Sequence, residues 1–176
     1  LARGDFTFVV SNMRAPINYV LFAGSLTSAV GFKVLAISPT VTLYDAAAPM
    51  HIRLARTSST DEMRVSWTSA QSEGTHAVQW GASLEESRPE PFALTELTIA
   101  KTHTYTASDL CGYPANQSGF HSPGFFHEAV LQLPTNRPTA SPLSIRYRVG
   151  SAEYGWSEER TFETPKPAGI EPYSAT

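Results

Sequence analysis

Apolar and polar side chains alternate along most of this chain. The alternation is clearest in short runs at residues 51–55, 63–67, 77–81, 126–133, 144–149 and 160–164. A period of two is the spacing of a β-strand, because successive side chains point to opposite faces of a sheet. One apolar face per strand indicates antiparallel sheets that are buried on one side. The residues predicted to face the core are Ile52, Leu54, Met63, Val65, Trp67, Val78, Trp80, Ile145, Tyr147 and Val149.

Turn signals separate these runs. The segment 69–75 is polar and contains Gly74, which is typical of a hairpin loop. About seven short antiparallel strands with such turns predict an all-β fold, a sandwich of the immunoglobulin or fibronectin type III kind. We assign this sandwich to residues 49–165.

The first part of the chain is less complete. Residues 1–48 hold strand-like runs at 6–10, 19–22, 32–37 and 41–44, which are too few to close a sandwich. We expect a partial β region there, the end of an upstream domain. The uncharged stretch 15–32 is short for a membrane span, which needs about 20 apolar residues, and it contains several polar ones. Two buried strands joined by a turn at 23–25 are the better interpretation.

Composition limits the partners and the chemistry. Apolar residues make up 41% of the chain and charged residues 16%, and the net charge is -3. No cluster of basic residues is present, so neither nucleic acid nor a membrane is expected as a partner. The single cysteine, Cys111, cannot form a disulfide within the chain. It is either a buried free thiol or the partner of a cysteine outside the chain.

No catalytic, cofactor-binding or metal-binding residue can be assigned. The five histidines show no H-x-H or H-x-x-x-H spacing. The nearest cluster of metal-type ligands is spread over a loop and a strand, and scattered histidines are the simpler interpretation; it comprises Asp109, Cys111, His121 and His127. The nucleophile elbow, the P-loop and the zinc-protease motif are all missing from the sequence.

One modification motif stands out. Asn116-Gln117-Ser118 is an N-glycosylation sequon without a central proline, in a stretch rich in Gly, Pro and Ser. Such a stretch predicts a surface loop. Asn116 is therefore a glycosylation candidate if the protein enters the secretory route.

The segment from Thr104 to His127 carries a family resemblance. It reads TYTASDLCGYPANQSGFHSPGFFH and resembles the motif T-Y-T-x-x-D-M-C-G-x-P-A followed by G-[WF]-x-x-P-G-F-I-H. This motif is found in the N-terminal domain of large plant-type purple acid phosphatases. Further stretches at 53–55, 61–68, 147–150, 155–158 and 162–165 also resemble that domain, and 12–14 with 22–24 resembles the β region before it. One departure is Ile145, where the family usually has a tyrosine.

The resemblance implies a parent enzyme that hydrolyses phosphate monoesters. Members of the family use a dinuclear centre of iron with iron, zinc or manganese, held by a later metallophosphoesterase domain. The ligand motifs of that domain do not occur in this sequence. The resemblance further implies that 166–176 is a linker toward that catalytic domain, which would be the partner in the same chain or as a separate fragment. It allows a homodimer of the parent. Together with the sequon, it implies secretion or a cell-wall location, although no signal peptide is visible.

Two functions follow as expectations. The first is a non-catalytic accessory domain that packs on and supports the catalytic domain. The alternative is a free-standing fibronectin-like extracellular module that binds protein or glycan. In the first case the Gly- and Pro-rich loop is the expected docking surface, and in the other it caps its own sandwich. The docking candidates are Tyr113, Phe120, Pro123, Gly124 and Phe125.

Overall fold

The computed structural model divides the chain into two compact units. They comprise Leu1–Ala46 and Ala47–Thr176. The structure describes residues 4–5, 7, 16–25, 31–42, 45, 47–83, 93–135 and 142–164. Most of the predicted strand at 6–10, the second half of the one at 41–44, and the linker at 166–176 therefore lie outside the described residues.

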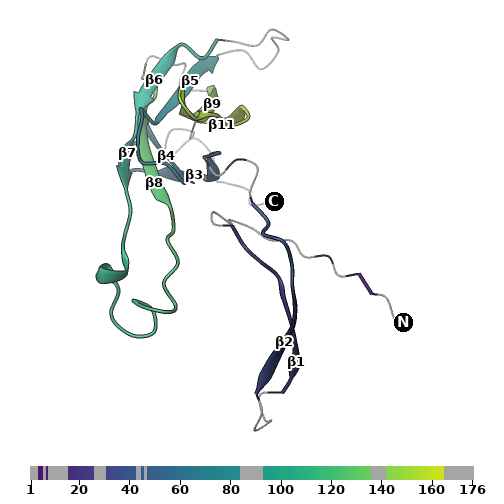
Figure 1. The fold of residues 1–176 in the computed structure, drawn as a ribbon. Helices are drawn as coiled ribbons and strands as arrows, with labels where there is room; N and C mark the ends of the chain where they lie inside the picture. Colours follow the sequence, from purple (N-terminus) through teal and green to yellow (C-terminus); the bar gives the residue numbers. More distant parts are fainter. Residues whose placement is uncertain are drawn as a thin grey trace, which may run out of the picture. The chain divides into compact units, whose positions relative to one another are not determined.

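The first unit contains a two-stranded antiparallel hairpin. Strand β1 (Val20–Gly24) pairs with β2 (Phe32–Ile37), with a bulge after Leu21 (Figure 1). Directly paired residues share a face, and alternation along each strand therefore gathers large apolar side chains on one side. These are Val20, Phe22, Phe32, Val34 and Ile37.

This face of the hairpin is exposed. Its five side chains are between 38% and 63% accessible, and the rings of Phe22 and Phe32 meet edge to face at 6.0 Å. The strand predicted at 32–37 is confirmed as β2, and the run predicted at 19–22 lies mostly in β1. The turn predicted at 23–25 is wrong, because Ala23 and Gly24 belong to β1, and the prediction that these strands are buried is wrong as well. An apolar sequence specifies a face that prefers burial. It does not specify the second layer, and no other described residue of this unit supplies one.

The second unit is an antiparallel sandwich of two sheets, as predicted. One sheet has the order β3-β4-β8-β7, and the other has the order β10-β9-β5-β6, with β11 also pairing with β9 (Figure 1). Their bounds are β3 Met50–Arg56, β4 Glu62–Ser69, β5 Ala77–Ser83, β6 Glu96–Ile99, β7 Lys101–His103, β8 Phe125–Gln132, β9 Ser144–Ser151, β10 Gly155–Trp156 and β11 Arg160–Glu163.

The core lies between the inner faces of β4 and β8 and those of β5 and β9. In the first sheet Val65 pairs with Ala129, and in the second Val78 pairs with Val149. Eight of the predicted core residues are buried, each 6% exposed or less: Met63, Val65, Trp67, Val78, Trp80, Ile145, Tyr147 and Val149. Burial raises the pKa of the Tyr147 hydroxyl, and the nearby positive charge of Arg160 partly offsets this.

The ends of the first sheet differ from the expectation. Ile52 is only partly buried against the core, and Leu54 is 37% exposed. Strand β3 therefore contributes less buried apolar surface to the core than its alternation predicted. Strand β3 lies at the sheet edge and has a register shift between Met50 and Arg53, which interrupts its regular contact with β4.

Strands β6 and β7 are absent from the sequence-based prediction. Only Ala100 separates them, yet β6 pairs with β5 in one sheet and β7 pairs with β8 in the other. The chain therefore changes sheets within one residue, which divides the run 96–103 into two short edge strands. Leu97 and Ile99 on β6 are 57% and 66% exposed, so this run lacks the buried face by which the other strands were recognised.

We expect Trp67→Ala to lower the free energy of unfolding by about 3–5 kcal/mol, because it empties a core aromatic site. Trp67 is 1% exposed and pairs with His127 across the sheet. Urea unfolding of both proteins measures the difference. The matched control is Arg64→Ala on the outer face of the same strand, where an exposed ion pair to Glu128 at 3.3 Å contributes about 0–1 kcal/mol. Equal stability of the Trp67 variant and the parent would contradict the assigned core face.

Candidate docking site

A long loop connects β7 to β8. It comprises residues 104–124 and continues past the ends of both strands (Figure 1). Its one regular element is a short 3-10 helix, Ala107–Asp109. Its described backbone hydrogen bonds are local, such as those from the Gln117 and Gly119 N–H groups to the Pro114 carbonyl at 3.1 and 2.9 Å. The loop is therefore held by turns rather than by a ladder of strand pairing.

Aromatic packing joins the two limbs of the loop. The Tyr105 ring stacks on Phe126 with centroids 6.0 Å apart and meets Phe120 edge to face at 6.5 Å. The Thr104 hydroxyl donates a hydrogen bond to the Gly124 carbonyl at 2.6 Å. Phe120 thus has a partner inside the loop, which lowers the area that it can offer to another domain.

A carboxylate fixes the first turn of the loop. Asp109 accepts hydrogen bonds from the Thr106 backbone N–H at 2.7 Å and from the Thr106 hydroxyl at 2.9 Å. The backbone bond, followed by the hydroxyl bond, holds the pKa of the Asp109 carboxyl below its ordinary value. The folded turn is therefore stabilised above the ordinary pKa of a free carboxyl. This contribution is lost as the pH falls through the folded-state pKa.

The base of the loop is anchored by a buried histidine. His127 Nε2 lies 2.8 Å from the Ser69 hydroxyl on β4, and Nδ1 lies 2.9 Å from the Thr102 hydroxyl on β7. The Ser69 hydroxyl donates its hydrogen to the Gln71 carbonyl at 3.0 Å, so it accepts from the histidine. These bonds fit a neutral imidazole with its hydrogen on Nε2, which accepts from Thr102 at Nδ1.

A second histidine covers the first. The His76 ring stacks on the His127 ring with centroids 3.9 Å apart. The Trp67 ring also stacks on His127, with centroids 5.3 Å apart. Both ring nitrogens of His76 are buried without a hydrogen-bond partner. Because the two rings are stacked, their nitrogens do not converge on one point as metal ligands would. Sequence reasoning missed this pair, although the inward alternation of His127 with Ala129 could have indicated it.

The five predicted docking residues do not share one exposed surface. Tyr113 is 77% exposed. Phe120 and Pro123 are half-buried, and Gly124 is buried. Phe125 is half-buried as the first residue of β8, where it pairs with Ser69. Of the five, Tyr113 offers the largest free area to a partner.

Metal-type ligands do not gather in the described part of the chain. No group of three or more His, Cys, Asp or Glu side chains that could hold a metal occurs there. Asp109 is bound to Thr106, whereas His127 is enclosed in the sandwich. The donor set therefore does not fit a dinuclear metal centre. Cys111 is a free thiol on the surface, so the alternative of a buried thiol is wrong.

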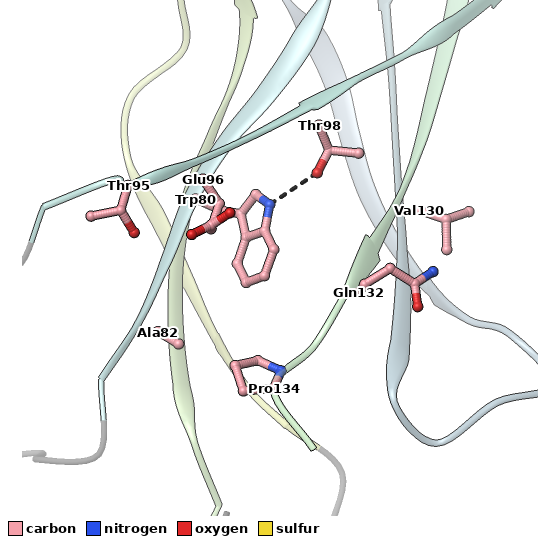
Figure 2. A pocket seen from close by; sticks show the side chains of 8 residues that line it. All are labelled: Trp80, Ala82, Thr95, Glu96, Thr98, Val130, Gln132 and Pro134. Atoms are coloured by element: carbon pink, nitrogen blue, oxygen red, sulfur yellow. Dashed lines mark hydrogen bonds between the residues drawn. The ribbon is translucent and has the colours of Figure 1, made fainter. Parts of the chain in front are cut away.

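An open pocket lies where β6 crosses the edge of β8. Its volume is about 440 Å³, and the Trp80 side chain stands in the middle of its lining, with its indole N–H donating to the Thr98 hydroxyl at 3.0 Å (Figure 2). Glu96 is the single titratable group of the lining. A lone carboxylate provides no pair for acid–base chemistry.

The chain is similar to proteins of known family. The model of a family described as "Purple acid Phosphatase, N-terminal domain" matches residues 49–136. The chain belongs to the purple acid phosphatase family. The matched residues include all four strands of the first sheet and the whole 104–124 loop, so the predicted resemblance is confirmed and the loop is part of the family's N-terminal domain.

Relatives and a solved structure agree with this assignment. "Probable inactive purple acid phosphatase 27" of Arabidopsis thaliana is 31% identical over 163 residues, which are 89% of this chain and 24% of the relative. "Probable inactive purple acid phosphatase 1" of the same plant is 30% identical over 92% of this chain and 25% of the relative. The purple acid phosphatase PPD1 of yellow lupin superposes with a TM-score of 0.69 at 28% identity, over 92% of this chain and 26% of that chain.

The chain thus spans about a quarter of the length of the purple acid phosphatases that it matches. The first unit has 46 of the 176 residues, which is more than the part of the chain that the lupin superposition leaves uncovered. The superposition therefore includes residues of the first unit. Within the described residues, no helix has the length and apolar character required to cross a membrane.

We expect backbone amides of residues 112–124 to exchange with solvent far faster than those of β4 and β8, because their described hydrogen bonds lie in exposed turns. Hydrogen–deuterium exchange with mass spectrometry on the 176-residue chain measures this. Tyr113→Ala should change the free energy of unfolding by no more than about 0.5 kcal/mol, as for other exposed side chains. Strong protection throughout 112–124 would instead mean that the loop caps its own sandwich.

Proposed function

We propose that this chain is a non-catalytic accessory part of a purple acid phosphatase, and that it packs on and supports a metallophosphoesterase domain. That domain would belong to the same protein or to a separate fragment. The single observation that carries the proposal is the apolar face of the β1–β2 hairpin, defined by Val20, Phe22, Phe32, Val34 and Ile37.

The exposure of this face favours the accessory role over the free-standing module. A two-stranded hairpin is at best marginally stable in water, and large exposed apolar patches usually mark an interface. A free-standing module is expected to stay soluble and monomeric by itself, which an uncovered apolar face of five side chains opposes. The purple acid phosphatases that match are about four times as long as this chain, which leaves a large remainder to cover the face. We propose that residues 1–48 form part of a β region completed by that remainder.

The loop 104–124 supplies a second contact in this proposal. Its most exposed aromatic side chain is Tyr113, and its base is fixed by the Ser69–His127–Thr102 hydrogen bonds. A rigid base with an exposed aromatic tip is the arrangement of an interface anchor, because tyrosine combines apolar area with one polar group. The chemistry of phosphate ester hydrolysis, the metals and a homodimer belong to the proposed parent enzyme. A secreted location fits the family and the sequon.

The purified chain should hydrolyse p-nitrophenyl phosphate no faster than a buffer blank, with or without added iron, zinc or manganese. A dinuclear site needs several carboxylate and histidine ligands with supporting hydrogen bonds, and the described residues do not gather such a set. Phosphatase assays across the purification measure this. Metal-dependent turnover that follows the protein through every column would overturn the non-catalytic role.

The chain should bind a hydrophobic dye such as anilinonaphthalene sulfonate through the β1–β2 hairpin. The double variant Phe22→Thr with Val34→Thr should lower the dye fluorescence by about half, because it removes two of the five apolar side chains. The matched control is Ala23→Thr with Ala36→Thr on the opposite face of the same strands. Equal fluorescence of all three proteins would remove the support for an interface and favour the free-standing module.

A further inference from the structure

The sequon at Asn116 has a geometry suited to its chemistry. It lies in the run of turns at residues 113–119. The Asn116 N–H donates to the Gly112 carbonyl at 3.1 Å, and the Gln117 N–H donates to the Pro114 carbonyl at 3.1 Å. These turns hold Gln117 and Ser118 on the exposed side of the loop.

The two polar atoms of the Asn116 amide differ in burial. Its Oδ1 atom is buried without a hydrogen-bond partner. Its Nδ2 atom is not fully buried and has no hydrogen-bond partner among the described residues. The nitrogen is therefore the atom of this amide that keeps contact with solvent, and it is the atom to which a sugar would be joined.

The surroundings of Asn116 also leave room. A side chain added at Gly112 would meet no atom within 4 Å, which shows open space beside the turn that Asn116 closes. The Ser118 side chain is exposed and makes no hydrogen bond within the described chain, so its hydroxyl is free to be recognised together with the asparagine.

We propose that Asn116 carries an N-linked oligosaccharide. In this modification Nδ2 loses a proton and forms a bond to the anomeric carbon of an oligosaccharide held on a lipid diphosphate. The bond from that carbon to the diphosphate oxygen breaks, and the lipid diphosphate leaves. No residue of this chain is oxidised or reduced. This site does not depend on docking to a catalytic domain.

The test is to produce the 176-residue chain behind a cleavable secretion signal in a eukaryotic host. Intact mass should show one glycan, and peptide N-glycosidase should remove it and convert Asn116 to aspartate, which peptide mass spectrometry locates. Measuring the membrane fraction of the cells as well as the medium keeps the result independent of export. An unmodified mass in both fractions would overturn the proposal.

Matched variants assign the site. Asn116→Gln and Ser118→Ala should both lose the glycan, whereas Ser118→Thr should keep it, since the sequon accepts either hydroxyl. Asn18→Gln should leave the glycan in place, because Asn18 is outside any sequon and bonds to Ser38 and Thr40. A glycan that persists in Asn116→Gln, or that is lost from Ser118→Thr, would mean that this site is wrong.

Discussion

The structure depends on the contact between the inner faces of its two sheets. Trp67 and Val65 from one sheet and Trp80 and Val78 from the other are almost completely buried. Each strand contributes side chains to the core at every second position. A shift of one residue in the pairing of a strand would therefore turn its core side chains toward solvent. The loop depends on this contact as well, because His127, which anchors its base, belongs to the same inner face.

The loop and the hairpin differ from the sandwich in how much of their apolar surface they bury. The sandwich buries most of its large apolar side chains internally, and the exposed ones, such as Leu97 and Ile99, lie on edge strands. The hairpin instead exposes the apolar face defined above, and the loop exposes Tyr113. In the function proposed above, these exposed surfaces are the points of attachment to the rest of a protein about four times as long. Under that proposal, stability comes from the sandwich and attachment from the hairpin and the loop.

Polar groups refine this division. The buried His127 side chain provides hydrogen bonds that join β8 to β4 and to β7. At the surface of the loop, Asp109 remains charged and closes a turn. The Asn116 amide combines both conditions, because its oxygen is buried and its nitrogen reaches solvent. These polar groups differ in their access to water. A charge or an unpaired donor costs little free energy where water reaches it and much more where it is buried.

The sequence by itself determined the strands with an inward apolar face, because alternation is a local property that each run carries alone. It therefore specified β4, β5, β8 and β9 with their core residues, and its ordered motifs specified the family. Only the tertiary structure decided that the hairpin is exposed, that β6 and β7 separate at Ala100, that His76 covers His127, and that Tyr113 is the free aromatic side chain of the loop. These features depend on which distant segments come to lie together, and short-range periodicity carries no information about that.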